Sequence, residues 1–328
     1  MAFQLYPCFH TIIAGMTAPK TSFQNFMSRI IDYAGMYPPA NLSLEDAFKN
    51  FVDYQDSPDS WMLSRFVVPA KKLAPLSDLM AGSPDGLTFT TPGRSGSTAD
   101  EFLANLNLDL ADIRSLREAH GDKVVVDMFE VALPSSALHD AATAHDLVKA
   151  SSDLLNKNGL TVFFEAPFGE GWQTRAENLI RALRKLKDRH VGFKLRTGGV
   201  TADAFPSTEQ VAWAIAKARD SGIPMKCTAG LHHPIRHFNE SVQTKMHGFL
   251  NVFGAGLLAA ENGLSQEQIQ SILEDEDPKS FIFDETGFAW NDLRVASSGI
   301  AKARQFATSF GSCSFDEPRE DLRGLGLL

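Results

Sequence analysis

The stretch Val191-Gly-Phe-Lys-Leu-Arg-Thr-Gly-Gly199 has the pattern of a buried strand that ends in a lysine, an arginine and two glycines. A similar stretch, Pro224-Met-Lys-Cys-Thr-Ala-Gly-Leu-His-His233, follows one strand–helix unit later. Side chains alternate along a strand, so Lys194 and Arg196 are expected to point to the same side. Lys194 and Lys226 would lie on neighbouring parallel strands, where burial and a nearby like charge both disfavour the ammonium form. A neutral lysine amine is a nucleophile for carbonyl carbons.

The composition limits the class of protein. The 328 residues are 44% hydrophobic and 22% charged, as in an ordinary globular chain. No apolar run reaches the ~18 residues of a membrane span, and a net charge of −9 without a basic block argues against nucleic acid as the main partner. The first residues lack a basic segment before their apolar stretch, so no secretory signal is expected. The three widely separated cysteines, Cys8, Cys227 and Cys313, fit a reducing, cytoplasmic setting.

Strand-like and helix-like segments alternate along most of the chain. The expected strands are the apolar runs 29–34, 64–68, 87–91, 123–129, 161–165, 191–196, 224–228 and 249–253. Helical spacing is found in 42–53, 76–80, 99–120, 141–156, 174–189, 208–220 and 265–273. This alternation predicts a parallel sheet covered on both faces, and eight units at this length favour a (β/α)8 TIM barrel. An open doubly wound sheet is the alternative, but no GxGxxG loop occurs early in the chain.

We expect one domain over residues 1–328, with short N- and C-terminal extensions. The barrel would occupy about residues 29–275 and the C-terminal extension residues 276–328. Within that extension, Phe281–Glu285 is a candidate ninth strand and Trp290–Phe306 a candidate helix.

Polar side chains fall near the ends of the expected strands, where barrels of this class carry their chemistry. They are Asp32, Asp127, Glu165, Lys194, Arg196, Lys226 and Thr228, with Asn251 on the last expected strand. Any one of them could be an interior polar residue of the kind that barrels carry anyway. Together, on otherwise apolar strands, they indicate a site, because buried charges need partners.

Six short stretches follow one another in an order that suggests a family. They are Ile31-Asp-Tyr-Ala-Gly-Met-Tyr-Pro38, Phe66-Val-Val-Pro69, Val126-Asp-Met-Phe-Glu-Val131, Phe163-Phe-Glu165, Gly192-Phe-Lys-Leu-Arg-Thr-Gly-Gly199 and Met225-Lys-Cys-Thr-Ala-Gly-Leu231. Over about residues 29–256 this order resembles the deoxyribose-phosphate aldolase family, class I aldolases on a TIM barrel. The resemblance implies that Lys194 forms a Schiff base with the substrate carbonyl. It also implies that Lys226 lowers the pKa of Lys194, that Asp127 relays protons near both, and that Glu165 belongs to the site.

The sequence departs from the family where the family binds phosphate. Those places read Ala229-Gly230 and Asn251-Val-Phe-Gly-Ala-Gly256, without serine, and the family's C-terminal tyrosine has no counterpart. A phosphorylated sugar is therefore not expected. Arg196 replaces a small residue, and its guanidinium suits a carboxylate or another planar anion. The chain also resembles a group of bacterial proteins that share the RTGG stretch at 196–199 and the AGLHH stretch at 229–233, and this likeness implies no function.

Three functions are compatible with these residues. The leading hypothesis is a Schiff-base lyase or aldolase that acts on a small carbonyl compound without metal or cofactor. Its substrate contacts would come from Asp32, Arg196, Thr197, Thr228, His232, Arg236 and Asn251. The second is a metal-dependent hydrolase or isomerase that uses Glu165, Asp127 and His232. The third is a non-catalytic barrel that binds an anion through Arg196 and Arg236. Whether the chain forms a homo-oligomer is left open.

Overall fold

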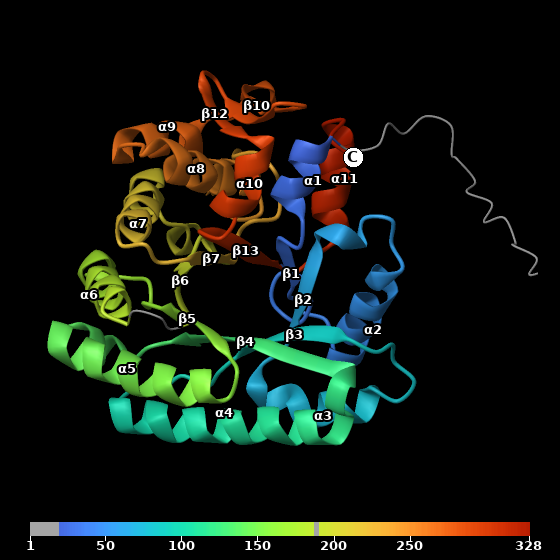
Figure 1. Ribbon diagram of the computed structural model, residues 1–328, viewed down its shortest axis with the longest axis vertical. Helices are drawn as coiled ribbons and strands as arrows, with labels where there is room; N and C mark the ends of the chain where they lie inside the picture. Colours follow the sequence, from blue (N-terminus) through green and yellow to red (C-terminus); the bar gives the residue numbers. More distant parts are fainter. Residues whose placement is uncertain (1–19, 187–189) are drawn as a thin grey trace, which may run out of the picture.

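The computed structural model describes residues 20–186 and 190–328, and a closed barrel of eight parallel strands forms its centre (Figure 1). Around the barrel the strands are β1 (Ile31–Tyr33), β2 (Leu63–Val67), β3 (Leu87–Pro92), β4 (Val124–Ala132), β5 (Thr161–Glu165), β6 (Val191–Arg196), β7 (Met225–Thr228) and β13 (Ala307–Ser312). The predicted (β/α)8 TIM barrel is therefore confirmed. Seven of the strands lie where the apolar runs placed them.

Helices cover the outside of the barrel, as the alternating pattern predicted (Figure 1). They are α2 (Leu44–Gln55), α3 (Leu73–Leu79), α4 (Ala99–His120), α5 (Ala141–Lys157), α6 (Trp172–Arg184), α7 (Thr208–Asp220), α8 (Phe249–Asn262) and α9 (Gln266–Glu274). Their starts follow from local chemistry. At α7 the Ser207 side chain accepts a hydrogen bond from the Gln210 backbone, and the Gln210 side chain accepts one from the Ser207 backbone. This capping box satisfies two backbone N–H groups that the helix leaves unpaired.

The expected eighth strand, Phe249–Phe253, is wrong, because these residues open helix α8. A short apolar run does not distinguish a buried strand from a buried helix, and here the run continues to Ala260. A helix that is apolar all round must be buried, and α8 is buried from Phe249 to Ala259. The eighth strand of the barrel is instead β13, which pairs with β7 on one side and β1 on the other. The barrel therefore closes within the segment that was expected to be an extension.

The C-terminal segment also carries a small sheet of its own. Strands β10 (Phe281–Asp284), β11 (Gly287–Trp290) and β12 (Leu293–Ala296) pair antiparallel. The candidate ninth strand is thus a strand outside the barrel, whereas the candidate helix 290–306 forms only as α10 (Ser297–Ala303). The N-terminal helix α1 (Thr21–Met27) packs on this sheet, with the ring of Phe26 5.2 Å from that of Phe283.

Two further elements complete the chain. A hairpin of β8 (His237–Asn239) and β9 (Thr244–Met246) follows β7, and helix α11 (Asp316–Gly324) follows β13. Cys8 lies outside the described residues, and Cys227 and Cys313 are free thiols. None of the helices in the described part of the chain has the length and apolar character needed to cross a membrane.

The barrel strands are irregular at three places that matter for the site. Register shifts occur between β1 and β2, between β3 and β4, and between β7 and β13. Each shift inserts an extra residue, which reverses the side to which the following side chains point. The extra residue of β4 is Asp127, and the shifts in β2 and β13 fall beside Arg65 and Ser309.

Candidate active site

A cavity of about 440 Å³ lies at the carboxyl ends of the barrel strands. Four residues that the sequence singled out line it: Lys194, Arg196, Thr228 and His232. Most of the other lining residues are small or apolar, from Ala34 after β1 to Gly311 on β13. The cavity thus combines an apolar wall with a few cationic and hydroxyl groups, as small-molecule sites do.

The two lysines stand side by side, but a carboxylate separates their charges. Lys194 on β6 pairs in register with Lys226 on β7. Glu130 on β4 lies between their amines, with Oε2 2.9 Å from Lys194 Nζ and Oε1 3.1 Å from Lys226 Nζ. The Thr90 hydroxyl donates a third hydrogen bond to Glu130, over 2.8 Å. Lys194 lines the cavity, whereas the side chain of Lys226 is only 1% exposed and lies beneath it.

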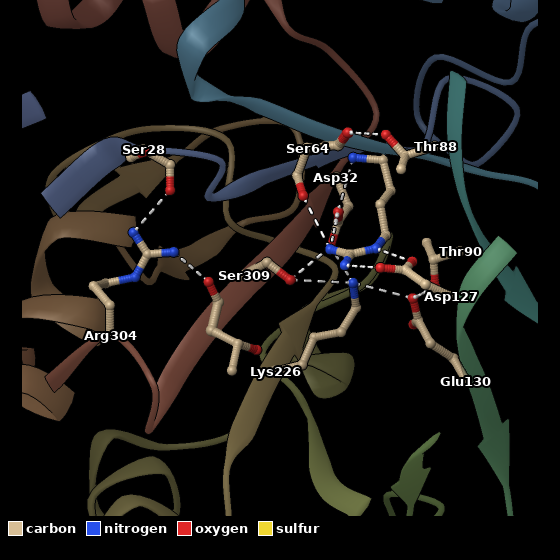
Figure 2. A network of polar contacts seen from close by, with 12 residues as sticks. Ser28, Asp32, Ser64, Thr88, Thr90, Asp127, Glu130, Lys226, Arg304 and Ser309 are labelled. Carbon is tan, nitrogen blue, oxygen red and sulfur yellow. Dashed lines mark hydrogen bonds and ion pairs between the residues drawn. The ribbon is translucent and has the colours of Figure 1, made fainter. Parts of the chain in front are cut away.

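A column of polar groups continues from Lys226 down the barrel axis (Figure 2). The Lys226 ammonium pairs with Asp32, which is fully buried, and lies 3.4 Å from the Ser309 hydroxyl. The Ser309 hydroxyl donates to Asp32 over 2.6 Å, and the backbone N–H of Arg65 donates to the other Asp32 oxygen over 3.1 Å. Asp32 therefore anchors Lys226 from below and does not line the cavity.

These contacts shift the pKa of Lys194 in the direction opposite to the expected one. Burial alone would lower the pKa of Lys194, but the carboxylates of Glu130 and Glu165 outweigh it and hold that pKa above its usual range. Burial raises the pKa of Glu130, yet the Lys194 and Lys226 charges outweigh this and bring it down to about 2. The predicted lowering of the Lys194 pKa by Lys226 is thus wrong for this arrangement, because attraction to two carboxylates exceeds repulsion between two ammoniums.

Asp127 lies elsewhere, and Glu130 occupies the place expected for it. The Asp127 carboxylate accepts hydrogen bonds from the Arg65 side chain at 2.7 and 2.6 Å. Strand β4 runs on to Ala132, and its bulge at Asp127 changes the alternation, so Glu130 faces the lysines instead. The available signal was a lone carboxylate in the apolar stretch 128–132.

Arg196 and Glu165 form a second ion pair at the cavity. Arg196 Nε donates to Glu165 Oε1 over 3.2 Å, and Glu165 Oε2 lies 3.4 Å from Lys194 Nζ. The Glu165 side chain is buried, whereas that of Arg196 is 41% exposed. Arg196 therefore keeps part of its guanidinium available to the cavity.

His232 lies in the cavity wall between Cys313 and helix α11. Its Nδ1 atom is 3.2 Å from Glu317 Oε2 and 3.7 Å from Cys313 Sγ. Burial lowers the pKa of His232, but these two partners outweigh it and raise that pKa to about 9. A protonated His232 thus holds α11 against the cavity.

Three of the expected substrate contacts, Thr197, Asn251 and Arg236, do not line this cavity. The Thr197 hydroxyl donates to the Ala229 carbonyl over 2.6 Å and joins the loops after β6 and β7. Asn251 is buried in α8, where its side chain accepts from the Arg236 backbone N–H and donates to the Ile272 carbonyl. Arg236 lines a separate cavity of about 430 Å³.

The residues of the metal hypothesis do not converge. Asp127 pairs with Arg65, Glu165 with Lys194 and Arg196, and His232 with Glu317. Across residues 20–186 and 190–328, no three histidine, cysteine or carboxylate side chains are placed to hold one metal ion.

Comparison with known proteins adds little to this geometry. No family model and no curated protein sequence matches the chain, so the likeness to a bacterial group with the RTGG and AGLHH stretches has no support. Among solved structures, the chain is similar to a deoxyribose phosphate aldolase from Aeropyrum pernix, described as having a unique tetrameric structure. The identity is 12%, over 94% of this chain and 99% of that chain, with a TM-score of 0.49. The barrel assignment rests on the strand pairing, and the reaction must be argued from the site.

Proposed function

We propose that the chain is an aldolase-like lyase in which Lys194 forms a Schiff base with a small carbonyl compound. The observation that carries this proposal is a lysine that lines the cavity although its side chain is only 11% exposed. Surface lysines keep their ammonium groups in water, whereas this one is surrounded by Glu130, Glu165 and the barrel wall. A lysine in such a place fits covalent chemistry at a carbonyl carbon.

Glu130 and Glu165 stabilise the cationic iminium intermediate more than they stabilise the neutral amine. When Lys194 condenses with a carbonyl, its nitrogen becomes an iminium cation at the place where the ammonium stood. Glu130 and Glu165 therefore stabilise the iminium by the same attraction that raises the Lys194 pKa. The iminium withdraws electrons from the adjacent carbon–carbon bond, which can then break or form.

The amine must first lose a proton, and we assign Glu165 to receive it. Glu130 binds protons weakly, because its place between two ammoniums lowers its pKa to about 2. Glu165 touches only one lysine, at 3.4 Å, and lies nearer to Arg196. Glu130 then acts as a fixed counter-charge and Glu165 as the exchangeable base.

The strongest competing function is a non-catalytic barrel that binds an anion. The raised pKa of Lys194 favours it, because an ammonium is not a nucleophile. One observation counts against it. Arg196 and Arg236, which would hold the anion together, line different cavities.

Borohydride trapping tests the proposal directly. The protein is incubated with acetaldehyde, glyceraldehyde, pyruvate or glyoxylate and reduced, and the adduct is mapped by mass spectrometry. We expect one adduct on Lys194, absent from Lys194→Met and retained in Lys217→Met. Lys217 is a suitable control, because it lies on helix α7 and pairs with Glu177 outside the barrel. Labelling that is absent, or scattered over surface lysines, would favour the binding barrel.

Arg196 points to a carbonyl substrate that carries a carboxylate. Its guanidinium is partly exposed in the cavity that Lys194 lines, so it can pair with a carboxylate near the reacting carbon. A hydrogen bond to a charged group contributes about 1.5–3 kcal/mol, so Arg196→Leu should slow labelling by pyruvate roughly 10- to 100-fold relative to acetaldehyde. The ratio of the two rates is the measured quantity, because losing the Glu165 partner affects both compounds alike. An unchanged ratio would show that Arg196 does not select the substrate.

A further inference from the structure

Tyr37 is a residue of the cavity that the sequence patterns did not reveal. It follows β1 in a loop and lines the same cavity as Lys194. Its backbone is fixed on both sides: its N–H donates to the Ala34 carbonyl over 2.9 Å, and its carbonyl accepts from the Asn41 N–H over 3.0 Å. Within the described parts of the chain, its hydroxyl has no hydrogen-bond partner. Tyr37 is half-buried in the cavity wall, so this hydroxyl is available to a ligand there.

Tyr37, Lys194 and Glu130 line the same cavity. Burial raises the pKa of Tyr37 to about 12, while the charges of Lys194 and Glu130 act on it in opposite directions. The phenol stays protonated at neutral pH and can donate a hydrogen bond from its O–H.

The cavity wall also contains two cationic hydrogen-bond donors, and each of them is paired with a carboxylate. Arg196 donates to Glu165, and His232 pairs with Glu317. The Thr228 hydroxyl also lines the cavity, but an alcohol is a much weaker acid than a phenol. Tyr37 is thus the acid of the Lys194 cavity whose proton has no acceptor within the described parts of the chain.

We propose that Tyr37 is a catalytic residue, whose hydroxyl donates a hydrogen bond to the substrate carbonyl oxygen and then transfers its proton to that oxygen. This inference rests on the proposed function of Lys194 as the nucleophile. It assigns the acid of the reaction to the loop after β1.

The bond changes and proton transfers balance as follows. The neutral Lys194 amine forms the nitrogen–carbon bond, the carbonyl π pair moves to oxygen, and that oxygen takes the Tyr37 proton. The phenolate recovers a proton from the adduct nitrogen, which leaves a neutral carbinolamine. Tyr37 then protonates the carbinolamine hydroxyl, which departs as water while the nitrogen lone pair closes the carbon–nitrogen double bond. The proton that Lys194 released earlier returns to Tyr37 through Glu165 and solvent.

The experiment compares Tyr37→Phe with the wild type and with a matched control, Tyr33→Phe. Tyr33 is buried against the rings of Tyr54 and Phe66 and does not line the cavity, and its hydroxyl accepts only a 3.4 Å hydrogen bond from Asn50. Trapping with pyruvate and with acetaldehyde is followed over time, together with release of the adduct after dilution. General acid catalysis is worth about 10²–10⁴-fold, so Tyr37→Phe should slow formation and release by at least 10²-fold and leave the equilibrium fraction of adduct unchanged. Tyr33→Phe should keep wild-type rates.

The outcomes separate this inference from the function on which it rests. If Tyr37→Phe forms the Lys194 adduct at the wild-type rate, the Tyr37 assignment is wrong and the Schiff-base function stands. If the equilibrium fraction falls while the rate of release is unchanged, Tyr37 only binds the substrate, and the assignment is wrong again. If the wild type gives no Lys194 adduct with either compound, both proposals fall together.

Discussion

Replacing Asp32 with alanine is expected to lower the free energy of unfolding by about 3–5 kcal/mol, the usual cost of removing one partner from a buried ion pair. Asp32 is fully buried and receives hydrogen bonds from Lys226, Ser309 and the Arg65 backbone. Without it, the Lys226 ammonium would keep only Glu130 as a charged partner, at a depth that water does not reach. Urea titration of both proteins at neutral pH measures the difference.

A double-mutant cycle distinguishes the ion pair from simple loss of packing. If the pair carries the effect, Asp32→Ala combined with Lys226→Met should be less destabilising than the sum of the single changes by about 2–3 kcal/mol. Asp53→Ala is the matched control, because Asp53 forms an exposed pair with Lys49, and such pairs contribute about 1 kcal/mol or less. Additive losses at the buried pair would show that Asp32 and Lys226 are not coupled.

The rate of Schiff-base formation is expected to rise about tenfold per pH unit from pH 7 to 10, a total of roughly 10³-fold. The rate should rise with pH because the pKa of Lys194 is raised. Below that pKa the nitrogen is mostly ammonium, and each unit of pH increases the reactive amine tenfold. Timed samples are taken at each pH and reduced under one fixed condition, so that only adduct formation varies with pH.

Glu130→Gln provides the decisive comparison. Removal of this carboxylate leaves Lys226 as a repelling charge and should lower the Lys194 pKa. The rate of adduct formation by the variant should therefore level off at a lower pH than the rate of the wild type. A wild-type rate that already levels off by about pH 8 would mean that Lys194 has a lowered pKa.

The fold could be predicted largely because β-strands and helices alternate with different hydrophobic periods. The runs that became β5 and β6 coincide with the observed strands, since each is a short apolar segment bounded by turn residues. Strand β13, Ala307-Thr-Ser-Phe-Gly-Ser312, escaped prediction because four of its six residues are hydroxyl-bearing or glycine. The hydroxyl of Ser309 belongs to the polar column inside the barrel, which no local pattern reveals. The apolar start of α8 was therefore predicted as the eighth strand in place of β13.

The site was predictable to the extent that strict alternation holds. Alternation placed Lys194 and Lys226 on facing positions of adjacent strands, where the structure has them. It failed at Asp127, because a bulge is a property of the paired strands and not of the sequence of one. Tyr37 was missed for another reason. Loop residues have no periodicity, and only the folded chain shows that the β1 loop reaches the Lys194 cavity.

The late position of β13 determines when the barrel can be completed during synthesis. Strands β1 and β7 both pair with β13, so each remains an open sheet edge until residues 307–312 have left the ribosome. Exposed parallel edges favour pairing with other chains, and pairing between distant segments is slow. Asp32 and Lys226 lie on those two edges, so their charges stay in water until the last strand enters between them. The nascent chain thus carries hydrated charges where an apolar edge would aggregate, and the same charges become the buried support of the cavity once the ring closes.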